Sequence, residues 1–492
     1  MAGESTPLLI GSDRLDSSRD EVQDSYLTEA KVLVTRAWPV SAANLLQYSI
    51  NAASLFSLGH MSTKYLAAAA LGTMLCNVTG NGVASGLTSA LDTLCSQAFT
   101  ASDDIHAVGK LLQRGIIVMF IFCIPISLFW SDTKPFFVTL GQDPEISSLA
   151  AEFLRCMIPG LFPSFVNECL RKYLQAQGIM KPGMYINIVG LLITIFLQWL
   201  LVFSSYSIGF IGAPIATSIT YICVTILSVL YIAFIEGNAC WGGWSWKEAL
   251  QIQGCWEIIK LGIPGVFMIC SEWGAFEIMG LAAGLLGAEY LASQTIVLNI
   301  CSLSFNVPLG LSVATSTRVG NKLGANLPQT AKHVAKTAFM CALGTATIHA
   351  TILVGFRHYL GYVFTSDPVL ISIVADVLPL AGLYQFSEHC GAVGGGVIRG
   401  CALQRYGAPI TLSGYYILGL PFGLYLSFYQ GMDLVGVWIG LTFGLMFVST
   451  CYLTIVYRLD WKNQAELAVS RILQDSGLES ETTSLISGEE QA

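Results

Sequence analysis

The chain has 492 residues, of which 54% are hydrophobic and only 11% are charged, with a formal net charge of −8. A soluble domain carries about a quarter charged residues, so this composition excludes a globular protein with a water-exposed surface. Apolar stretches near the ~20 residues that a helix needs to cross a bilayer recur along the whole chain. The alternating ~10-residue pattern of a membrane β-barrel is absent, so the sequence predicts a polytopic helical membrane protein.

Polar tails flank the apolar region. Residues 1–30 hold no basic segment followed by an apolar core, so we expect no signal peptide and predict a disordered tail. Residues from about 463 onward have a similar composition, and we assign 461–492 to a second tail. An acidic residue precedes a bulky pair in each tail, at Glu4 before Leu8-Leu9 and at Glu481 before Leu485-Ile486. These motifs resemble acidic dileucine signals for sorting adaptors, which predicts a vacuolar, lysosomal or endosomal membrane, with the plasma membrane as the alternative.

Each half of the chain contains six apolar stretches that are long enough to span a membrane. We predict spans at 33–58, 66–90, 107–130, 148–168, 184–204, 211–236, 258–286, 290–314, 331–355, 370–398, 409–429 and 434–457. With the N-terminus in the cytosol, eighteen Lys and Arg residues flank the spans on that side, against three (Lys64, Lys134, Arg357) on the other. Cytoplasmic loops carry the excess of Lys and Arg, so both termini are predicted to be cytoplasmic.

The two halves repeat each other. Pro39 and Tyr65-Leu66-Ala67 match Pro264 and Tyr290-Leu291-Ala292 at an offset of 225, and Gly212 matches Gly436 at 224. Six spans per repeat is an even number, so the repeats lie parallel in the membrane, related by a pseudo-twofold axis along its normal. The predicted fold is an all-α membrane protein of twelve transmembrane helices, with lobes at 31–236 and 258–460 and a linker at 237–257.

Three carboxylates lie inside predicted spans of the second half. They are Glu272 and Glu277 in the seventh span and Glu388 in the tenth. Intramembrane carboxylates are costly and mark functional sites by default, although a protonated Glu that clasps two helices is the structural alternative. The repeat partners of Glu272 and Glu388 are Gln47 (272 − 225) and Ser164 (388 − 224), so the acid at these two positions is confined to the second lobe.

Histidines and prolines in the spans carry weaker signals. His389 beside Glu388 is as consistent with packing as with function, and we assign no role to His349. Pro39 and Pro264 occupy equivalent places in the first and seventh spans, and we predict that they act as hinges.

Four segments together resemble the multidrug and toxic compound extrusion (MATE) family of transporters, eukaryotic type. They read LDTLCSQAFTA at 91–101, SEWGAFEIMGLAAGLLGAEYLASQ at 271–294, STRVGNKLGA at 316–325 and GGGVIRGCALQRYGA at 394–408. The resemblance covers about residues 30–460. It implies a V-shaped arrangement of the lobes, alternating access, and efflux driven by a proton or sodium gradient.

The resemblance also implies where the site lies. Eukaryotic members are mostly proton antiporters with an acidic site in the C-terminal lobe, where Glu272, Glu277 and Glu388 fall. Prokaryotic members often use an Asp in the first span, where this chain has Gln47 and Asn51 instead. Some animal members carry a carboxylate in the eighth span, where this chain has Asn299.

A mechanism follows as a hypothesis. A buried Glu holds a proton, because desolvation penalises its charged form, and a cationic aromatic substrate competes with that proton for the carboxylate. Trp273 and Tyr384, with Phe276, offer ring faces for cation–π contact. The expected partners are therefore a small organic substrate, protons or sodium, and membrane lipids, with no nucleic acid, cofactor or metal.

Other functions remain as alternatives. A lipid-linked-precursor flippase of the same superfamily is expected to line its cavity with Arg or Lys, whereas the candidate residues here are acidic. An exporter of organic anions such as flavonoid conjugates also stays open. An enzyme is disfavoured because no HExxH or GxSxG motif occurs, and a channel because no filter-like motif occurs.

Overall fold

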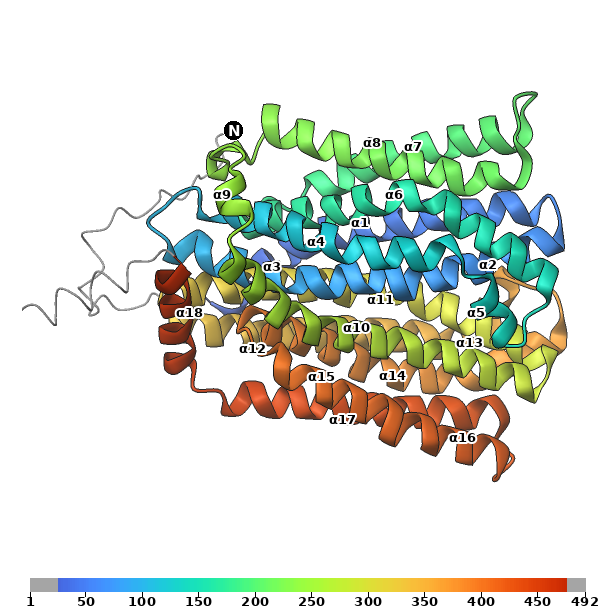
Figure 1. Cartoon of the computed structure of the whole chain (residues 1–492). Helices are drawn as coiled ribbons and strands as arrows, with labels where there is room; N and C mark the ends of the chain where they lie inside the picture. Colours follow the sequence, from blue (N-terminus) through green and yellow to red (C-terminus); the bar gives the residue numbers. More distant parts are fainter. Residues whose placement is uncertain (1–24, 476–492) are drawn as a thin grey trace, which may run out of the picture.

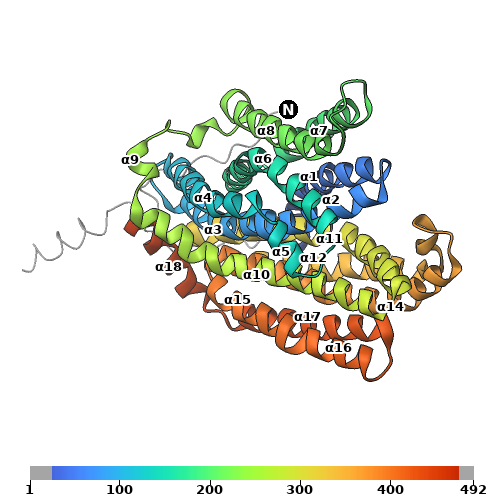
Figure 2. The same cartoon turned by 45° about the vertical axis from the view of Figure 1, so that its right-hand side comes forward.

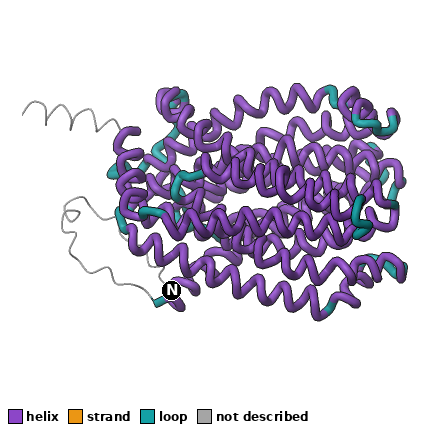
Figure 3. The backbone as a smooth tube through the Cα atoms, turned by 90° about the horizontal axis from the view of Figure 1, so that it is seen from below, coloured by secondary structure: helices purple, strands orange, loops and turns teal. Residues whose placement is uncertain are grey.

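The computed structural model describes residues 25–475, which are almost entirely helical and include no strand (Figures 1 and 3). The helices of the first half are α1 Tyr26–Gly59, α2 Thr63–Cys76, η1 Asn77–Asn81, α3 Gly82–Ala101, α4 Ala107–Ser131, α5 Lys134–Thr139, α6 Pro144–Ala176, α7 Pro182–Gln198, η2 Trp199–Phe203, η3 Gly209–Ile211 and α8 Gly212–Phe234. The linker holds η4 Asn238–Cys240 and α9 Trp246–Ala249.

The second half repeats this order. Its helices are α10 Ile252–Leu286, α11 Ala288–Gly324, α12 Pro328–Gly355, α13 Arg357–Leu360, η5 Gly361–Val363, α14 Pro368–Gly400, α15 Gln404–Leu412, η6 Ser413–Gly419, α16 Leu420–Phe428 and α17 Asp433–Arg458, followed by α18 Trp461–Asp475. We call α1–α8 the N lobe and α10–α17 the C lobe. In Figures 1 and 2, α3 of the N lobe and α11 of the C lobe run through the middle of the molecule. The other helices of the two lobes lie on opposite sides of this pair.

Eleven helical segments of the described chain are long and apolar enough to cross a membrane. The remaining predicted span is α1, whose 34 residues include polar side chains such as Asn44, Gln47 and Asn51. These side chains lower its mean hydropathy, and α1 is enclosed by contacts with α7 and α11. Its polar residues therefore lie at contacts with other helices. The length and mean hydropathy of a single helix do not reveal such contacts.

Each lobe has its own hydrophobic core. One core is built from C-lobe residues, with Leu33 and Ala37 added from α1 and Trp461, Ala465 and Ala468 from α18. The other is built from N-lobe residues and their linker, with Ile258 and Ile472 added from later segments. Two separate cores allow the lobes to move as bodies relative to each other.

Two equivalent helices of the lobes, α6 and α14, begin and end in the same way. Asp143 and Asp367 are the N-caps of α6 and α14, each followed by proline at the first helical position. The Asp143 carboxylate accepts from the backbone N–H of Glu145 at 2.9 Å, and the Asp367 carboxylate accepts from that of Val369 at 2.8 Å. Both helices have 33 residues, and their starts differ by 368 − 144 = 224. The Asp-Pro pair is a local start signal that the duplication preserved.

A left-handed residue follows both helices, and in the C lobe it is not glycine. Gly178 has φ +81°, whereas its repeat partner Ala402 (178 + 224) has φ +60°. An L-residue in this conformation costs roughly 1–2 kcal/mol. We expect Ala402→Gly to stabilise the folded protein by about 1 kcal/mol, measured as a higher thermal unfolding midpoint in detergent. The reciprocal Gly178→Ala variant is expected to lower the midpoint, and a lower midpoint for Ala402→Gly contradicts the prediction.

The contacts between the lobes come in reciprocal pairs. Gly310 of α11 lies against Ser41 of α1, and Gly86 of α3 lies against Val266 of α10. The repeat relates these contacts, because 41 + 225 = 266 and 86 + 224 = 310. A two-fold axis generates such pairs. A Cβ atom at Gly86 or Gly310 would overlap the opposite helix, so glycine is required for these helices to approach.

The second tail corrects one prediction from sequence. Residues 461–475, at the start of the stretch predicted to be a disordered tail, form α18. Trp461, Ala465, Ala468 and Ile472 are buried, and α18 contacts α3, α11 and α12. The apolar residues recur at helical spacing within a polar segment, a pattern that overall composition hides. The sorting motifs at 4–9 and 481–486 lie outside the described residues.

Candidate functional site

Two of the three predicted carboxylates come together inside the C lobe. Glu272 on α10 and Glu388 on α14 lie within electrostatic range of each other. Glu388 is 5% exposed. Tyr415 of η6 lies beside Glu272, and Tyr384 and Gln385 lie beside Glu388. We call these five residues the C-lobe cluster. Three separate helical segments supply it, one of them the π-helical η6, a backbone form that is frequent at functional sites.

The C-lobe cluster is rich in buried polar atoms that lack a well-formed hydrogen bond. Among the described residues these atoms are Tyr384 Oη, Tyr415 Oη, Glu388 Oε2 and the side-chain oxygen and nitrogen of Gln385, and the polar groups within their interaction range are members of the cluster itself. Buried polar atoms are nearly always hydrogen-bonded, and each exception calls for an explanation. A group of exceptions around two carboxyl groups has the chemistry to take up a proton, a water molecule or a cationic ligand.

The polar side chains of the N lobe contrast with this cluster. Tyr221 donates to Asn51 Oδ1 at 2.6 Å, and Ser228 donates to Asn167 Oδ1 at 2.7 Å. Gln198 donates to Ser54 Oγ at 2.9 Å. These side chains bond to one another across α1, α6, α7 and α8, although Gln198 Oε1 has no partner among the described residues. Such pairs stabilise helix contacts inside a membrane protein, so the asymmetry between the lobes lies in hydrogen bonding as well as in charge.

The structure separates the predicted amide residues from the carboxylates. Gln47 and Asn51 lie on α1 beside Tyr221 in the N lobe. Asn299 of α11 accepts a hydrogen bond at 3.0 Å from Tyr48 of α1. That bond joins the two lobes, so Asn299 lies at the interface between them.

The predicted aromatic residues also lie apart. Tyr384 is fully buried, between the rings of Phe276 at 6.5 Å and Trp438 at 5.6 Å. Trp273 faces the N lobe, where its ring lies against Gly82 of α3. Glu277 is half-buried and, within the described residues, has no hydrogen bond or ion pair. Of the predicted site residues, the structure therefore brings together Glu272, Glu388 and Tyr384.

The predicted hinges lie beside the contacts between the lobes. Pro39 is buried in α1, two residues before Ser41. Pro264 lies in α10, two residues before Val266. Because both residues that follow make the reciprocal helix contacts, each proline interrupts the backbone hydrogen bonding of a helix where the lobes meet.

Charged and amide side chains join the lobes at one end of the bundle, where α9 and α18 lie in Figure 1. We call it the α18 end. Asp92 of α3 is 5% exposed and pairs with Lys172 of α6 at 2.9 Å and with Arg399 of α14 at 3.7 Å. Arg399 also donates to Ser312 of α11 at 2.8 Å. Arg318 of α11 forms a two-pronged ion pair with Glu29 of α1, which is 1% exposed.

Two reciprocal hydrogen bonds complete this junction. Gln97 of α3 donates to the carbonyl oxygen of Gly400 at 2.9 Å, and Asn321 of α11 donates to that of Ala176 at 3.3 Å. The repeat relates both partners, because 97 + 224 = 321 and 176 + 224 = 400. Each amide thus satisfies a carbonyl at the C-terminal end of the opposite lobe's helix. Arg471 of α18 donates to Gln97 Oε1 at 2.8 Å. We call Asp92, Gln97, Lys172, Asn321 and Arg399 the interlobe network.

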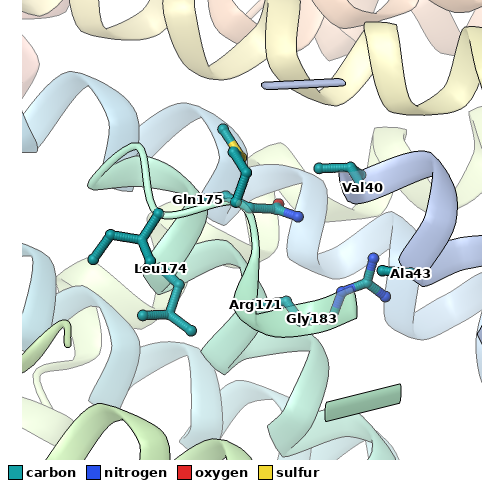
Figure 4. Close-up of a pocket in the computed structure, with 8 residues that line it drawn as sticks. Val40, Ala43, Arg171, Leu174, Gln175 and Gly183 are labelled. Carbon is teal, nitrogen blue, oxygen red and sulfur yellow. The ribbon is translucent and has the colours of Figure 1, made fainter. Parts of the chain in front are cut away.

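A small cavity lies near the same end, within the N lobe (Figure 4). Its volume is about 10 Å³, and its lining includes Val40, Ala43, Arg171 and Gln175. The Oε1 atom of Gln175 is buried and has no hydrogen-bond partner among the described residues. A cavity of this size holds a single water molecule, so it is not a substrate site.

Comparisons with known proteins agree with this architecture. The MatE family model matches residues 39–200 and 264–425, two copies at an offset of 225. An uncharacterized transporter of Schizosaccharomyces pombe is 34% identical over 92% of this chain and 84% of its own length. Multidrug and toxin extrusion protein 1 of Danio rerio is 33% identical over 91% of this chain and 75% of its own.

The chain belongs to the MATE family. The crystal structure of the eukaryotic MATE transporter AtDTX14 superimposes with a TM-score of 0.85 at 32% identity, over 91% of this chain and 99% of that one. The protein is thus a multi-pass membrane transporter with the twelve-helix MATE fold, as the sequence predicted. Among residues 25–475 of this MATE protein, no group of three or more His, Cys, Asp or Glu residues is arranged to hold a metal ion.

Sequence reasoning missed several residues that the structure assembles in this MATE protein. Tyr415 and Gln385 of the C-lobe cluster are ordinary polar residues of a span, and no local pattern marks them. Asp92 lies within the motif LDTLCSQAFTA, and a carboxylate in an apolar stretch is a signal that was available. Arg399 follows the motif GGGV on α14, but its partner lies in the other lobe, so sequence alone does not reveal the pair.

Proposed function

We propose that this MATE protein exports small organic cations in exchange for protons, and that both bind at the C-lobe cluster. The observation that carries the proposal is the pair Glu272 and Glu388 within electrostatic range of each other, beside buried polar atoms that lack a well-formed hydrogen bond. A multidrug and toxin extrusion protein among its relatives supports efflux of organic compounds. Sodium coupling and organic-anion export are the outcomes that the experiment below tests against.

The mechanism rests on competition for one charge. A carboxyl group removed from water holds its proton more tightly, because the charged form loses hydration. A cation that reaches Glu272 and Glu388 displaces that proton, and a proton from the opposite side later displaces the cation. Trp273, which faces the other lobe, offers a ring face to an aromatic cationic substrate, whereas the ring of Tyr384 is packed against those of Phe276 and Trp438.

Alternating access requires the interlobe network to open and close. We propose that the α18 end faces the cytosol, in agreement with the predicted cytoplasmic excess of Lys and Arg. The interlobe network then closes the cytoplasmic side in this structure, and rocking of the lobes about Pro39 and Pro264 breaks it. We place the protein in a vacuolar, endolysosomal or plasma membrane with both termini in the cytosol, where sorting adaptors reach its tails.

The test is uptake of ethidium, a fluorescent organic cation, into proteoliposomes with an imposed pH gradient, acidic inside. We expect accumulation that collapses with a protonophore and is unaffected by removal of sodium. Accumulation that requires sodium contradicts proton coupling. If ethidium does not accumulate but a flavonoid conjugate does, the substrate class is anionic and the proposal is wrong.

A further inference from the structure

Two histidines face each other at the edge of the C-lobe cluster. His389 of α14 is fully buried, and His349 of α12 is half-buried. Their ring centroids lie 5.0 Å apart with the ring planes at 74°. The repeat partner of His389 is Phe165 (389 − 224), so this residue, like the carboxylates, distinguishes the C lobe from the N lobe.

The hydrogen bonding of His389 defines which nitrogen can accept a proton. Its Nδ1 lies 2.8 Å from the backbone carbonyl oxygen of Gln385. A carbonyl oxygen only accepts, so Nδ1 carries the hydrogen and Nε2 of the neutral ring has the free lone pair. His389 Nε2 is buried and has no hydrogen-bond partner among residues 25–475, and His349 Nδ1 is buried within interaction range of the Gln385 side chain. The pair therefore presents proton-accepting nitrogens inside the lobe.

Gln385 connects the histidines to the carboxyl group. Its side chain lies within interaction range of His349 on α12 and of Glu388 one turn further along α14. An amide has one accepting oxygen and one donating nitrogen. With the oxygen toward His349, Gln385 accepts from a protonated imidazole and donates to a Glu388 carboxylate. With the amide reversed, it donates to a neutral imidazole and accepts from a protonated Glu388.

Arg399 is a cation that acts on Glu272 and Tyr452 in these surroundings, and its charge already pairs with Asp92. The titratable groups around the pair are Glu388 and Tyr384 on α14, Glu272 on α10, Cys301 on α11, Tyr415 on η6 and Tyr452 on α17. Elements that contact the ends of α12 carry charges that are already paired, such as Glu29 of α1 with Arg318. An imidazolium beside the ionised Glu388 is thus compensated within the lobe.

We propose that His349 and His389 form a proton-accepting pair of the transport site, with Gln385 as the positioning residue between them and Glu388. The inference rests on the proposed function. When Glu388 ionises, its O–H bond breaks and an N–H bond forms on the imidazole pair, which leaves a carboxylate and an imidazolium and requires no other reactant. In either location the proton offsets the charge of the carboxylate, so a cationic substrate is attracted only after the proton has left the lobe.

The proposal predicts how the histidines affect the pH dependence of substrate binding. A second location for the same proton can only increase the proton affinity of the whole site. If the proton divides equally between Glu388 and the imidazole pair, removal of the imidazoles lowers the midpoint pH by about 0.3 pH unit, and by more if the imidazoles hold the larger share. Ethidium affinity at alkaline pH, where every group has lost its proton, is expected to be unchanged.

The experiment measures the ethidium dissociation constant of the purified full-length protein from pH 5 to pH 9, by fluorescence. The variants are His349→Gln, His389→Asn and the double variant. The asparagine side chain keeps an N–H group that can donate to the Gln385 carbonyl oxygen. His358→Gln, on exposed α13, is the control. We expect a lower midpoint for both single variants and the largest shift for the double. Should the double variant aggregate, the single variants carry the test.

Each outcome separates the inference from the function on which it rests. A wild-type affinity that does not depend on pH contradicts the proposed function, and the inference falls with it. Midpoints of the histidine variants equal to that of the wild type overturn the inference alone. A uniform loss of affinity at every pH in a folded variant assigns the histidines to packing and also overturns it.

Discussion

Glutamine in place of Glu388 is expected to abolish the pH dependence of cation binding and to stop pH-driven transport. Glutamine keeps the size and hydrogen-bonding capacity of the protonated carboxyl group but cannot ionise. Coupling free energies between two ligands typically correspond to a 5- to 150-fold change in affinity, and we expect a ratio in that range between pH 8 and pH 5 for the wild type. For Glu388→Gln we expect a ratio near one, measured by ethidium binding and by uptake into proteoliposomes.

Two further variants show which carboxylate carries the effect. Glu272→Gln is expected to weaken coupling as strongly, because Glu272 lies within electrostatic range of Glu388. Glu277→Gln is expected to have a smaller effect, since the Glu277 side chain lies apart from the cluster. Glu152→Gln, on the exposed face of α6, is the control for loss of a carboxylate. Full pH-driven transport by both Glu272→Gln and Glu388→Gln would falsify the proposed mechanism.

Asp92→Asn is expected to open the α18 end. Removing one member of a buried ion pair typically costs 3–5 kcal/mol, because the remaining charge stays buried without compensation. Lys172 and Arg399 both lose their partner in this variant, and Arg399 regains water when the lobes separate. The equilibrium therefore shifts toward the state that is open at this end. We expect faster labelling of the fully buried Cys95, one turn along α3, by a membrane-impermeant thiol reagent.

The matched control is Asp104→Asn in the loop before α4. Asp104 pairs with Lys110 at 3.0 Å, but both side chains are more than a third exposed. Exposed ion pairs contribute about 0–1 kcal/mol, so this variant is expected to label Cys95 at the wild-type rate. An unchanged labelling rate in Asp92→Asn would show that the interlobe network does not hold this end closed.

The twelve-helix fold was predictable because its signals are local or periodic. Span length, the Asp-Pro starts of α6 and α14, and the repeat offset of 224 to 225 can all be read along the chain. The prediction from local composition was wrong for α18. A few buried residues within this polar segment pack the helix against both lobes. Local reasoning also set the start of the seventh span at 258, whereas α10 begins at Ile252.

The candidate site was only partly predictable. Three carboxylates stood out because each lies in an apolar stretch: Glu272, Glu277 and Glu388. This criterion does not distinguish one of them from another. The structure distinguishes them, since Glu272 and Glu388 lie within electrostatic range of each other while Glu277, within residues 25–475, has no recorded interaction with either. His349, which sequence reasoning set aside, lies against His389. Gln47, Asn51 and Asn299 were grouped with the carboxylates, yet they lie in the N lobe or at the interface.

Sequence by itself determined the class, the number of helices, the duplication and the lobe that carries the intramembrane acids. These properties follow from composition and from spacing along one chain, which hydrophobicity and helix geometry constrain directly. Tertiary structure alone decided which polar groups become partners, because side chains more than a hundred residues apart, such as Glu272 and Glu388 or Asp92 and Arg399, meet only when helices pack. Packing also decided which polar atoms are left without a well-formed hydrogen bond, and our proposal of a proton and substrate site in the C lobe rests on those around Glu272 and Glu388.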